Sequence, residues 1–156
     1  MSRTLRKCST QVSLVIATAM CFVASTVLAR LIGPNLFVAG DGFTLEQAVQ
    51  DAASQRTEQD SKTYKLLVVG SELKRITGSG ATRDVRDLLS KAAKAGAQVF
   101  VCVKDLKASG LRPADLLPGV RPVRGFQPEG AEPLEGWEKK LPRAPDRKML
   151  GICANN

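Results

Sequence analysis

A short apolar run near the middle of the chain, from Val99 to Val103, most constrains the fold. It reads Val-Phe-Val-Cys-Val, which is too short for a helix of its own and rich in β-branched and aromatic residues, so it predicts a buried strand. A short helix is expected to follow at once, from Lys104 to Ser109, closed by Gly110. Cys102 is therefore predicted where a strand gives way to a helix, and in open α/β sheets that edge gathers ligands and reactive groups.

The neighbouring segments contain further strands of the same kind. Leu36 to Gly40 is an apolar run ended by turn residues, and Tyr64 to Val69 is continuous enough in apolar residues to be covered on both faces. Another strand is expected from Val120 to Phe126, at an edge or a bulge, because Pro122 has no N–H to donate. The alternation of strands and helices predicts the α/β class: a three-layer βαβ fold with a mainly parallel sheet of about four to five strands.

Two long helices are expected between these strands. Thr44 caps the first, with Gln47 three residues on in a capping-box arrangement, and Thr82 caps the second, which Gly96 ends. Ahead of the second helix lies a glycine-containing loop, Thr77 to Gly80. It lacks a third glycine and the Gly-Lys-Ser/Thr of phosphate-binding loops, so a mobile loop is favoured over a nucleotide site and no cofactor is predicted.

Residues 1–29 carry the pattern of a secretory signal peptide. Arg3, Arg6 and Lys7 form a positive start, Val12 to Ala29 is largely apolar and uncharged, and the run ends in the small residues that a cleavage site requires. The apolar run is near the lower limit for spanning a bilayer, which makes an uncleaved anchor the alternative. Cleavage predicts a periplasmic or secreted protein, and retention predicts one anchored in the inner membrane.

Composition excludes several kinds of function. The chain has no histidine, which rules out Ser-His and Cys-His catalysis and the commonest zinc and iron ligand sets, so no metal site is predicted. Its 23 Lys and Arg and 15 Asp and Glu are scattered rather than blocked, and aromatic residues make up only 4%. Nucleic-acid surfaces usually interleave aromatic and basic side chains, so a solvated basic surface is favoured and no nucleic-acid partner is expected.

Beyond Phe126 the sequence loses its regular pattern. Repeated Pro and Gly in residues 127–156 predict a tail with no regular structure beyond a turn or two. Trp137 and the pair Met149-Leu150 are expected to pack this tail back on the domain. The predicted organisation is a signal peptide or anchor at 1–29, an α/β domain at 30–126 and a Pro/Gly-rich tail at 127–156.

Around Cys102 the chain resembles the DsrE/DsrF-like sulfur-relay proteins, a family of small α/β subunits. The residues that carry the resemblance are Gly96, Val101-Cys102, Leu106 and the turn Asp115-Leu116-Leu117-Pro118-Gly119-Val120. Upstream, Leu67-Val68-Val69-Gly70 followed by Glu72-Leu73 is similar to the family's second strand and the turn after it. The resemblance extends over residues 36 to 125 and implies a DsrE/DsrF-like fold.

Cys102 is the candidate catalytic residue. A thiol at a helix N-terminus meets the positive end of the helix dipole, which favours the thiolate, and Lys104 and Lys107 add positive charge nearby. A thiolate can attack a sulfane sulfur, hold it as a persulfide and pass it to another thiol. In the resembling family, a cysteine in this position carries the persulfide in some members, whereas others lack it and serve as scaffold subunits. The residues alone also allow a small buried hydrophobe with an inert thiol.

Three further residues are candidates near Cys102. Cys153 is the second candidate thiol, either a resolving thiol or disulfide partner for Cys102, or a free thiol of the tail. Glu72 and Asp41 follow candidate strands, so they are expected at the same sheet edge as Cys102. Carboxylates in such places are more often turn residues than acids or bases.

The sequence thus predicts an exported DsrE/DsrF-like protein that works in sulfur transfer or sulfur-compound metabolism through a persulfide-carrying Cys102. Its expected partners are a sulfur donor or acceptor protein, or a small sulfur compound, and a homo-oligomer is expected. A membrane is a partner only if the N-terminal segment is retained. The alternative is a non-catalytic binding or assembly subunit of the same fold with a structural cysteine.

Overall fold

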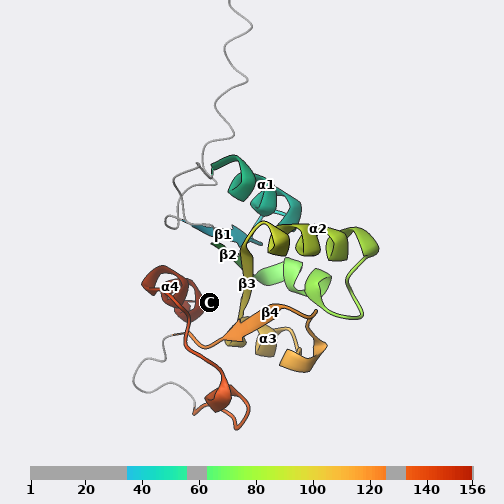
Figure 1. Cartoon of the computed structure of the whole chain (residues 1–156). Coiled ribbons are helices and arrows are strands. Elements are labelled where there is room, and N and C mark those ends of the chain that lie inside the picture. The colour runs from blue at the N-terminus through green and yellow to red at the C-terminus, as the bar shows by residue number, and fades with distance from the viewer. Residues whose placement is uncertain (1–34, 56–62, 126–132, 156) are drawn as a thin grey trace, which may run out of the picture. The chain divides into compact units, whose positions relative to one another are not determined.

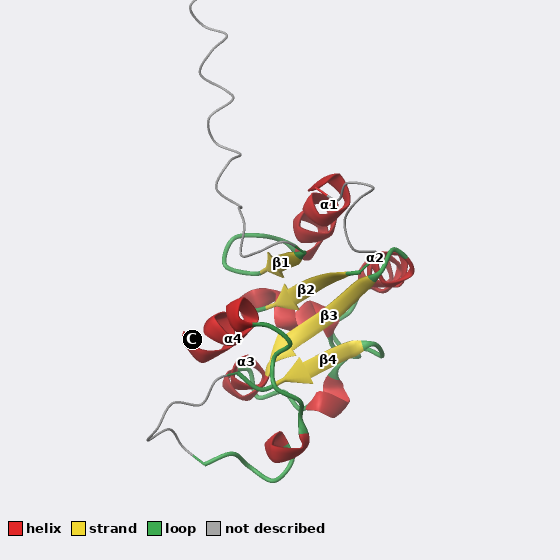
Figure 2. Cartoon of the chain, turned by 60° about the vertical axis from the view of Figure 1, so that its left-hand side comes forward, coloured by secondary structure: helices red, strands yellow, loops and turns green. Residues whose placement is uncertain are grey.

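Four parallel strands in the order β1-β2-β3-β4 organise the described chain, which in the computed structural model comprises residues 35–55, 63–125 and 133–155 (Figures 1 and 2). The strands are β1 (Leu36–Ala39), β2 (Tyr64–Val68), β3 (Ala97–Cys102) and β4 (Val120–Val123). The α-helices are α1 (Leu45–Gln55), α2 (Arg83–Lys94), α3 (Val103–Ala108) and α4 (Arg147–Asn155), and the 3₁₀ turns are η1 (Gly70–Ile76), η2 (Pro113–Asp115) and η3 (Glu138–Lys140). The predicted α/β class, with a parallel sheet and helices between the strands, is confirmed.

The register of the sheet places Cys102 at its carboxyl edge. Leu67 of β2 lies opposite Phe100 of β3, and Cys102, the last residue of β3, lies opposite Val123, the last residue of β4. Pro122 lies on β4, which is an edge strand, as its missing N–H predicted. The strand ends at Val123; the predicted end at Phe126 lies outside the described residues, as do the predictions for residues 1–29.

Alternate residues of the strands build two separate cores, one on each face of the sheet. The first-face core takes Leu66, Val68, Val99 and Val101 from the strands and is covered by α1, η1, α2 and α3. The second-face core takes Leu36, Leu67, Phe100, Cys102 and Val123 from the strands and Val69 from directly after β2, and it is covered by the segment that ends in α4. The predicted three layers are therefore present.

The strand order explains why one face receives so many helices. Each strand is followed by a helix and then by a parallel neighbour on the same side, and right-handed crossovers in such a series all fall on one face. Figure 1 shows the result, with α1 and α2 on one side of the sheet and α4, in red, on the other. The second face therefore depends on a segment that comes after the last strand.

Local signals set the ends of α1 and α2 as the sequence predicts. The Thr44 hydroxyl accepts a hydrogen bond from the backbone N–H of Gln47 at 3.2 Å. The side-chain Oε1 of Gln47 accepts one from the backbone N–H of Thr44 at 2.9 Å, which completes the capping box. The Thr82 hydroxyl accepts a bond from Val85 N–H at 3.3 Å. Gly96 ends α2 with a φ of 94°, a conformation that glycine adopts without strain.

The tail is more regular than its Pro and Gly content predicts. The expectation of nothing beyond a turn or two is wrong for α4, which runs for nine residues. Pro145 precedes the helix and leaves its interior free of proline, and the Asp146 side chain caps the first turn by accepting from Met149 N–H. Met149 is fully buried, so the prediction that it packs the tail on the domain is confirmed.

Candidate functional site

Cys102 lies at the junction of β3 and α3, where the sequence predicts it. It is both the last residue of β3 and the residue that precedes the first turn of α3. Its side chain belongs to the second-face core beside Phe100 and has no solvent exposure. The position at the carboxyl edge is thus that of a reactive group, while the burial is that of a core residue.

A disulfide joins Cys102 to Cys153. The two sulfurs are 1.99 Å apart and the two Cα atoms 5.3 Å apart, across 51 residues of sequence. Cys153 is only 4% exposed. Of the roles that the sequence left open for Cys153, the structure therefore contains the disulfide partner of Cys102 and not the free thiol of the tail.

The bridge is one of several contacts that hold α4 against the second face. Asp146 Oδ1 accepts from Met149 N–H at 2.6 Å, and Asp146 Oδ2 accepts from Lys65 Nζ of β2 at 3.0 Å. Burial alone would raise the pKa of Asp146, but the bonds from Met149 and Lys65 outweigh it and the pKa is lowered. The helix is thus anchored at its start by an ion pair and near its end by a covalent bond.

Gly125 sets how closely the end of α4 approaches the sheet. A Cβ placed on Gly125 would lie 2.8 Å from the Cβ of Cys153 and 2.9 Å from its backbone carbon. The segment before α4 also pairs with the chain just after β4: Arg124 N–H donates to Pro142 O, and Ala144 N–H donates to Arg124 O, both at 2.8 Å. The chain after β4 is therefore packed closely against both the segment before α4 and the end of α4 at Cys153.

Of the two lysines expected to favour a thiolate, Lys107 is engaged elsewhere. Its Nζ lies 3.3 Å from Glu138 Oε1 and 3.5 Å from Glu135 Oε1. The hydrogen bond with Glu138, whose side chain is buried, raises the pKa of Lys107. Lys104 is exposed on α3. The positive charge of Lys107 is therefore balanced by the tail.

Glu72 and Asp41 lie at the carboxyl edge with Cys102, as the sequence predicts, because they follow β2 and β1. Glu72 serves the structure there: its Oε2 accepts from Leu45 N–H at the start of α1, at 3.0 Å, and from Arg75 at 2.7 Å. The same Arg75 binds Glu46 of α1 and lowers the pKa of that carboxyl to about 2. Glu72 and Arg75 thus join η1 to α1.

Asp105 is a candidate that the sequence analysis did not identify. Its Oδ2 is buried and has no hydrogen-bond partner among the described residues. Burial raises the pKa of Asp105, the charge of Asp41 raises it further, and Lys104 opposes the shift. A raised carboxyl pKa suits a group that exchanges a proton. The available signal in the sequence is its position in the first turn of the helix expected after Cys102.

Two backbone donors of the glycine-containing loop before α2 bind acceptors of this chain. Gly80 N–H donates to the Thr77 hydroxyl at 3.0 Å, and Gly78 N–H donates to Asp115 O at 2.8 Å. A Cβ on Gly80 would fall 2.1 Å from Lys74 O, so this glycine permits a close turn. The loop is thus held by a bond within itself, to Thr77, and by a bond to Asp115 at the end of η2.

No protein-family model, curated protein or solved structure gives a significant match to this chain. Within residues 35–55, 63–125 and 133–155, no three His, Cys, Asp or Glu side chains gather in a way that could hold a metal ion. In the same part of the chain, no helix has the length and apolar character needed to cross a membrane.

Proposed function

We propose that this chain is an exported DsrE/DsrF-like domain that acts by binding, with Cys102–Cys153 as a structural bridge. One observation supports this choice over catalysis: both sulfurs are buried and bonded to each other. A sulfur carrier needs an accessible thiolate, and a cysteine in a disulfide offers none. The DsrE/DsrF-like family, which the segment around Cys102 resembles, includes scaffold subunits that work without a reactive thiol.

The proposed export has two independent supports. The pattern of residues 1–29 is that of a signal peptide or N-terminal anchor. Disulfides persist in the periplasm and outside the cell and are rare in the reducing cytoplasm. A bridge between two core residues is thus in keeping with a protein that functions in an oxidising compartment, released or held at the inner membrane.

A homo-oligomer is part of the proposal, since β1 and β4 are the edge strands of the sheet. The carboxyl end of β4 is flanked by the tail through the contacts of Arg124, whereas β1 has β2 as its only strand neighbour among the described residues. Sedimentation equilibrium of the isolated protein would test this expectation; a monomer at all concentrations would contradict it.

Sulfur transfer is the second candidate, supported by the place of Cys102 at the carboxyl edge, directly before α3. It requires that an external dithiol first open the bridge, becoming a disulfide itself while Cys102 and Cys153 gain the two electrons and two protons as thiols. The Cys102 thiolate would then attack the outer sulfur of a donor persulfide, R–S–SH. This gives Cys102–S–SH and the donor thiolate R–S⁻, and the sulfur passes to an acceptor thiol in the same way.

Intact mass spectrometry distinguishes the two candidates. Protein isolated without reductant should have the mass of the chain minus two hydrogens and should gain no sulfur from polysulfide or thiosulfate. A sulfur adduct on the wild type, absent in Cys102→Ser and retained in Cys153→Ser, would reject the structural role. An adduct that forms only after treatment with a dithiol would favour the second candidate. The same spectra show whether the chain begins at Arg30.

A further inference from the structure

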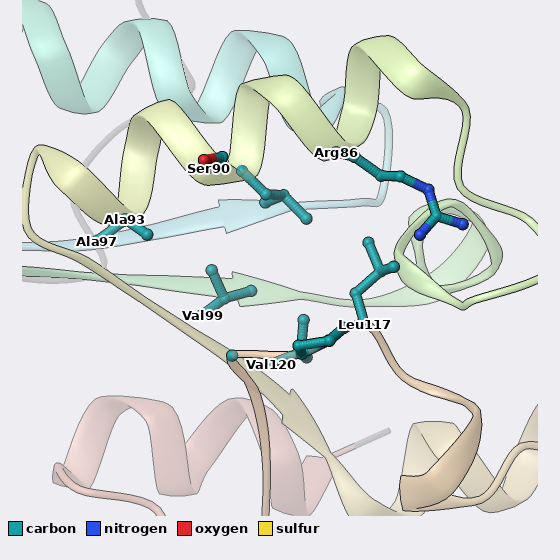
Figure 3. Close-up of a pocket in the computed structure, with 10 residues that line it drawn as sticks. Arg86, Ser90, Ala93, Ala97, Val99, Leu117 and Val120 are labelled. Carbon is teal, nitrogen blue, oxygen red and sulfur yellow. The ribbon is translucent and has the colours of Figure 1, made fainter.

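A groove opens on the first face of the sheet, between α2 and the start of β4. It has a volume of about 320 Å³. Leu89 of α2, Val99 of β3, Leu117 and Val120 give it an apolar lining, and Arg86 of α2 lies at one end (Figure 3). This volume is at the lower end of the range of small-molecule sites, about 300 to 1,000 Å³.

The groove exists because the helices of the first face leave one corner of the sheet uncovered. Val99 pairs with Val120 near the amino ends of β3 and β4, at the opposite end of the strands from Cys102. The chain reaches β4 through the exposed Pro118-Gly119 turn, and Val120 is left half-buried. Apolar side chains therefore line an opening that neither α2 nor α3 fills.

Arg86 brings one unbalanced positive charge to this apolar groove. Its Nη2 donates to Gly78 O at 2.7 Å, which fixes one end of the guanidinium. In the described parts of the chain it forms no ion pair, whereas Arg75 binds both Glu46 and Glu72. A guanidinium has five N–H donors, so Arg86 retains donors for an anion.

We infer that this groove binds a small monocarboxylate with an apolar body. The carboxylate pairs with Arg86, and the body lies over Leu89, Val99 and Val120. Arg86 is the only charged residue in the lining, which suits one negative charge rather than a phosphate dianion. The lining has no aromatic side chain for a base to stack on, so a nucleotide is disfavoured.

This inference deepens the proposed function, and rests on it, by giving the binding domain a ligand class. Arg86 and Ser90 at the rim are exposed, so water competes for the carboxylate. A dissociation constant on the order of 0.1 to 1 mM is expected for an eight-carbon ligand.

The test is a titration of the isotope-labelled full-length protein with sodium octanoate, followed by amide NMR shifts. Saturable shifts are expected at Leu89, Val99 and Val120. Arg86→Gln should weaken octanoate binding about tenfold, to the level of neutral octanamide on the wild type, while Arg86→Lys keeps part of the affinity. Arg83→Gln, an exposed arginine of the same helix outside the lining, is the matched control and should bind as the wild type does.

Ser90→Leu provides a second test, because a larger side chain at the rim should block the groove to octanoate and octanamide alike. Absence of saturable shifts up to 10-fold above the expected constant, at about 10 mM, would overturn the inference. Equal binding of octanoate by Arg86→Gln and wild type would also overturn it. The bridge lies on the other face of the sheet, so the two proposals can fail separately. If the protein binds octanoate but also gains sulfur at Cys102, only the structural role of the bridge is rejected. If Cys102 and Cys153 gain no sulfur and the protein does not bind octanoate, only the inferred ligand class is rejected.

Discussion

The two faces of the sheet are closed in different ways. The first face is covered by α1, η1, α2 and α3, each of which lies in the chain between two strands that it covers. The second face is covered by α4, which follows all four strands. The first face therefore closes as the strands pair, whereas the second closes only when a distant segment docks.

The difference explains where the covalent bond is placed. A nine-residue helix is too short to be stable alone in water, and a glycine, Gly151, lies inside α4. The helix propensity of α4 is too low to keep it folded alone, so its contacts with the sheet must stabilise it. The disulfide, the Lys65–Asp146 ion pair and buried Met149 supply that contact.

Removal of the bridge should give the largest loss in the free energy of unfolding, and it should act through the second face. In the chain-entropy view, closing a loop of 51 residues stabilises the folded state by about 4 kcal/mol. The double variant Cys102→Ala/Cys153→Ala should lose about that much in urea unfolding without reductant, and hydrogen exchange should accelerate in α4 before it does at Ile76 on the first face. Wild type in dithiothreitol is the parallel measurement. Equal stability with and without reductant would contradict a stabilising bridge.

Gly125→Ala should give the next largest effect, a loss of about 1 to 3 kcal/mol in the free energy of unfolding. The added Cβ meets the backbone of Cys153 at 2.9 Å, so α4 or the chain after β4 must shift. Gly136→Ala is the control, because a Cβ there meets nothing within 4 Å. A loss no greater than that of the control would show that α4 approaches less closely than described.

Asp146→Ala should lower the free energy of unfolding by about 1 kcal/mol, because it removes both the cap of α4 and the ion pair with Lys65. Asp146→Asn, which can still cap, should cost less. The pKa of Asp146 is lower in the folded protein, so its contribution is complete above its unfolded value of about 3.9 and is lost as the pH falls through the folded value. Urea midpoints measured from pH 6 to pH 2 should show a loss in the wild type that is smaller in Asp146→Asn. Parallel curves would contradict this coupling.

Gly151→Ala tests the comparison in the opposite direction. A Cβ there meets nothing within 4 Å, and alanine is favoured over glycine inside a helix by about 1 kcal/mol at most. The variant should raise the free energy of unfolding by somewhat less than that amount, through α4 alone. Thermal denaturation and exchange of α4 amides measure the gain, and a loss of stability would mean that position 151 packs against a neighbour.

The sequence predicts the first face better than the second because the signals of the first face are local. The Thr44–Gln47 box and the Thr82 cap are set by residues three apart, and each fixes its helix start without help from the rest of the fold. Residues 147–155 place Met149, Ile152 and Cys153 at helical spacing, but the segment is short and contains Gly151, so its pattern alone predicts a helix only weakly. Packing against the sheet decides the structure of that segment.

The candidate site follows the same division. The position of Cys102 between a strand and a helix could be predicted from the apolar run and the residues after it. Its pairing with Cys153 could be named only as one of several alternatives, since the positions of two cysteines in a sequence carry no information on their separation in space. The isolation of Asp105 and the groove beside Arg86 likewise depend on packing between elements, which one segment of sequence does not encode.

The late position of Cys153 has a consequence for the order of events in time. A polypeptide is made from its amino end, so all four strands are available before Cys153 is. Until then Cys102 is an unpaired thiol and Phe100 beside it lacks its cover. The bridge therefore forms only after all four strands have been made, and any enzyme that introduces it acts on a chain in which the whole sheet is already present.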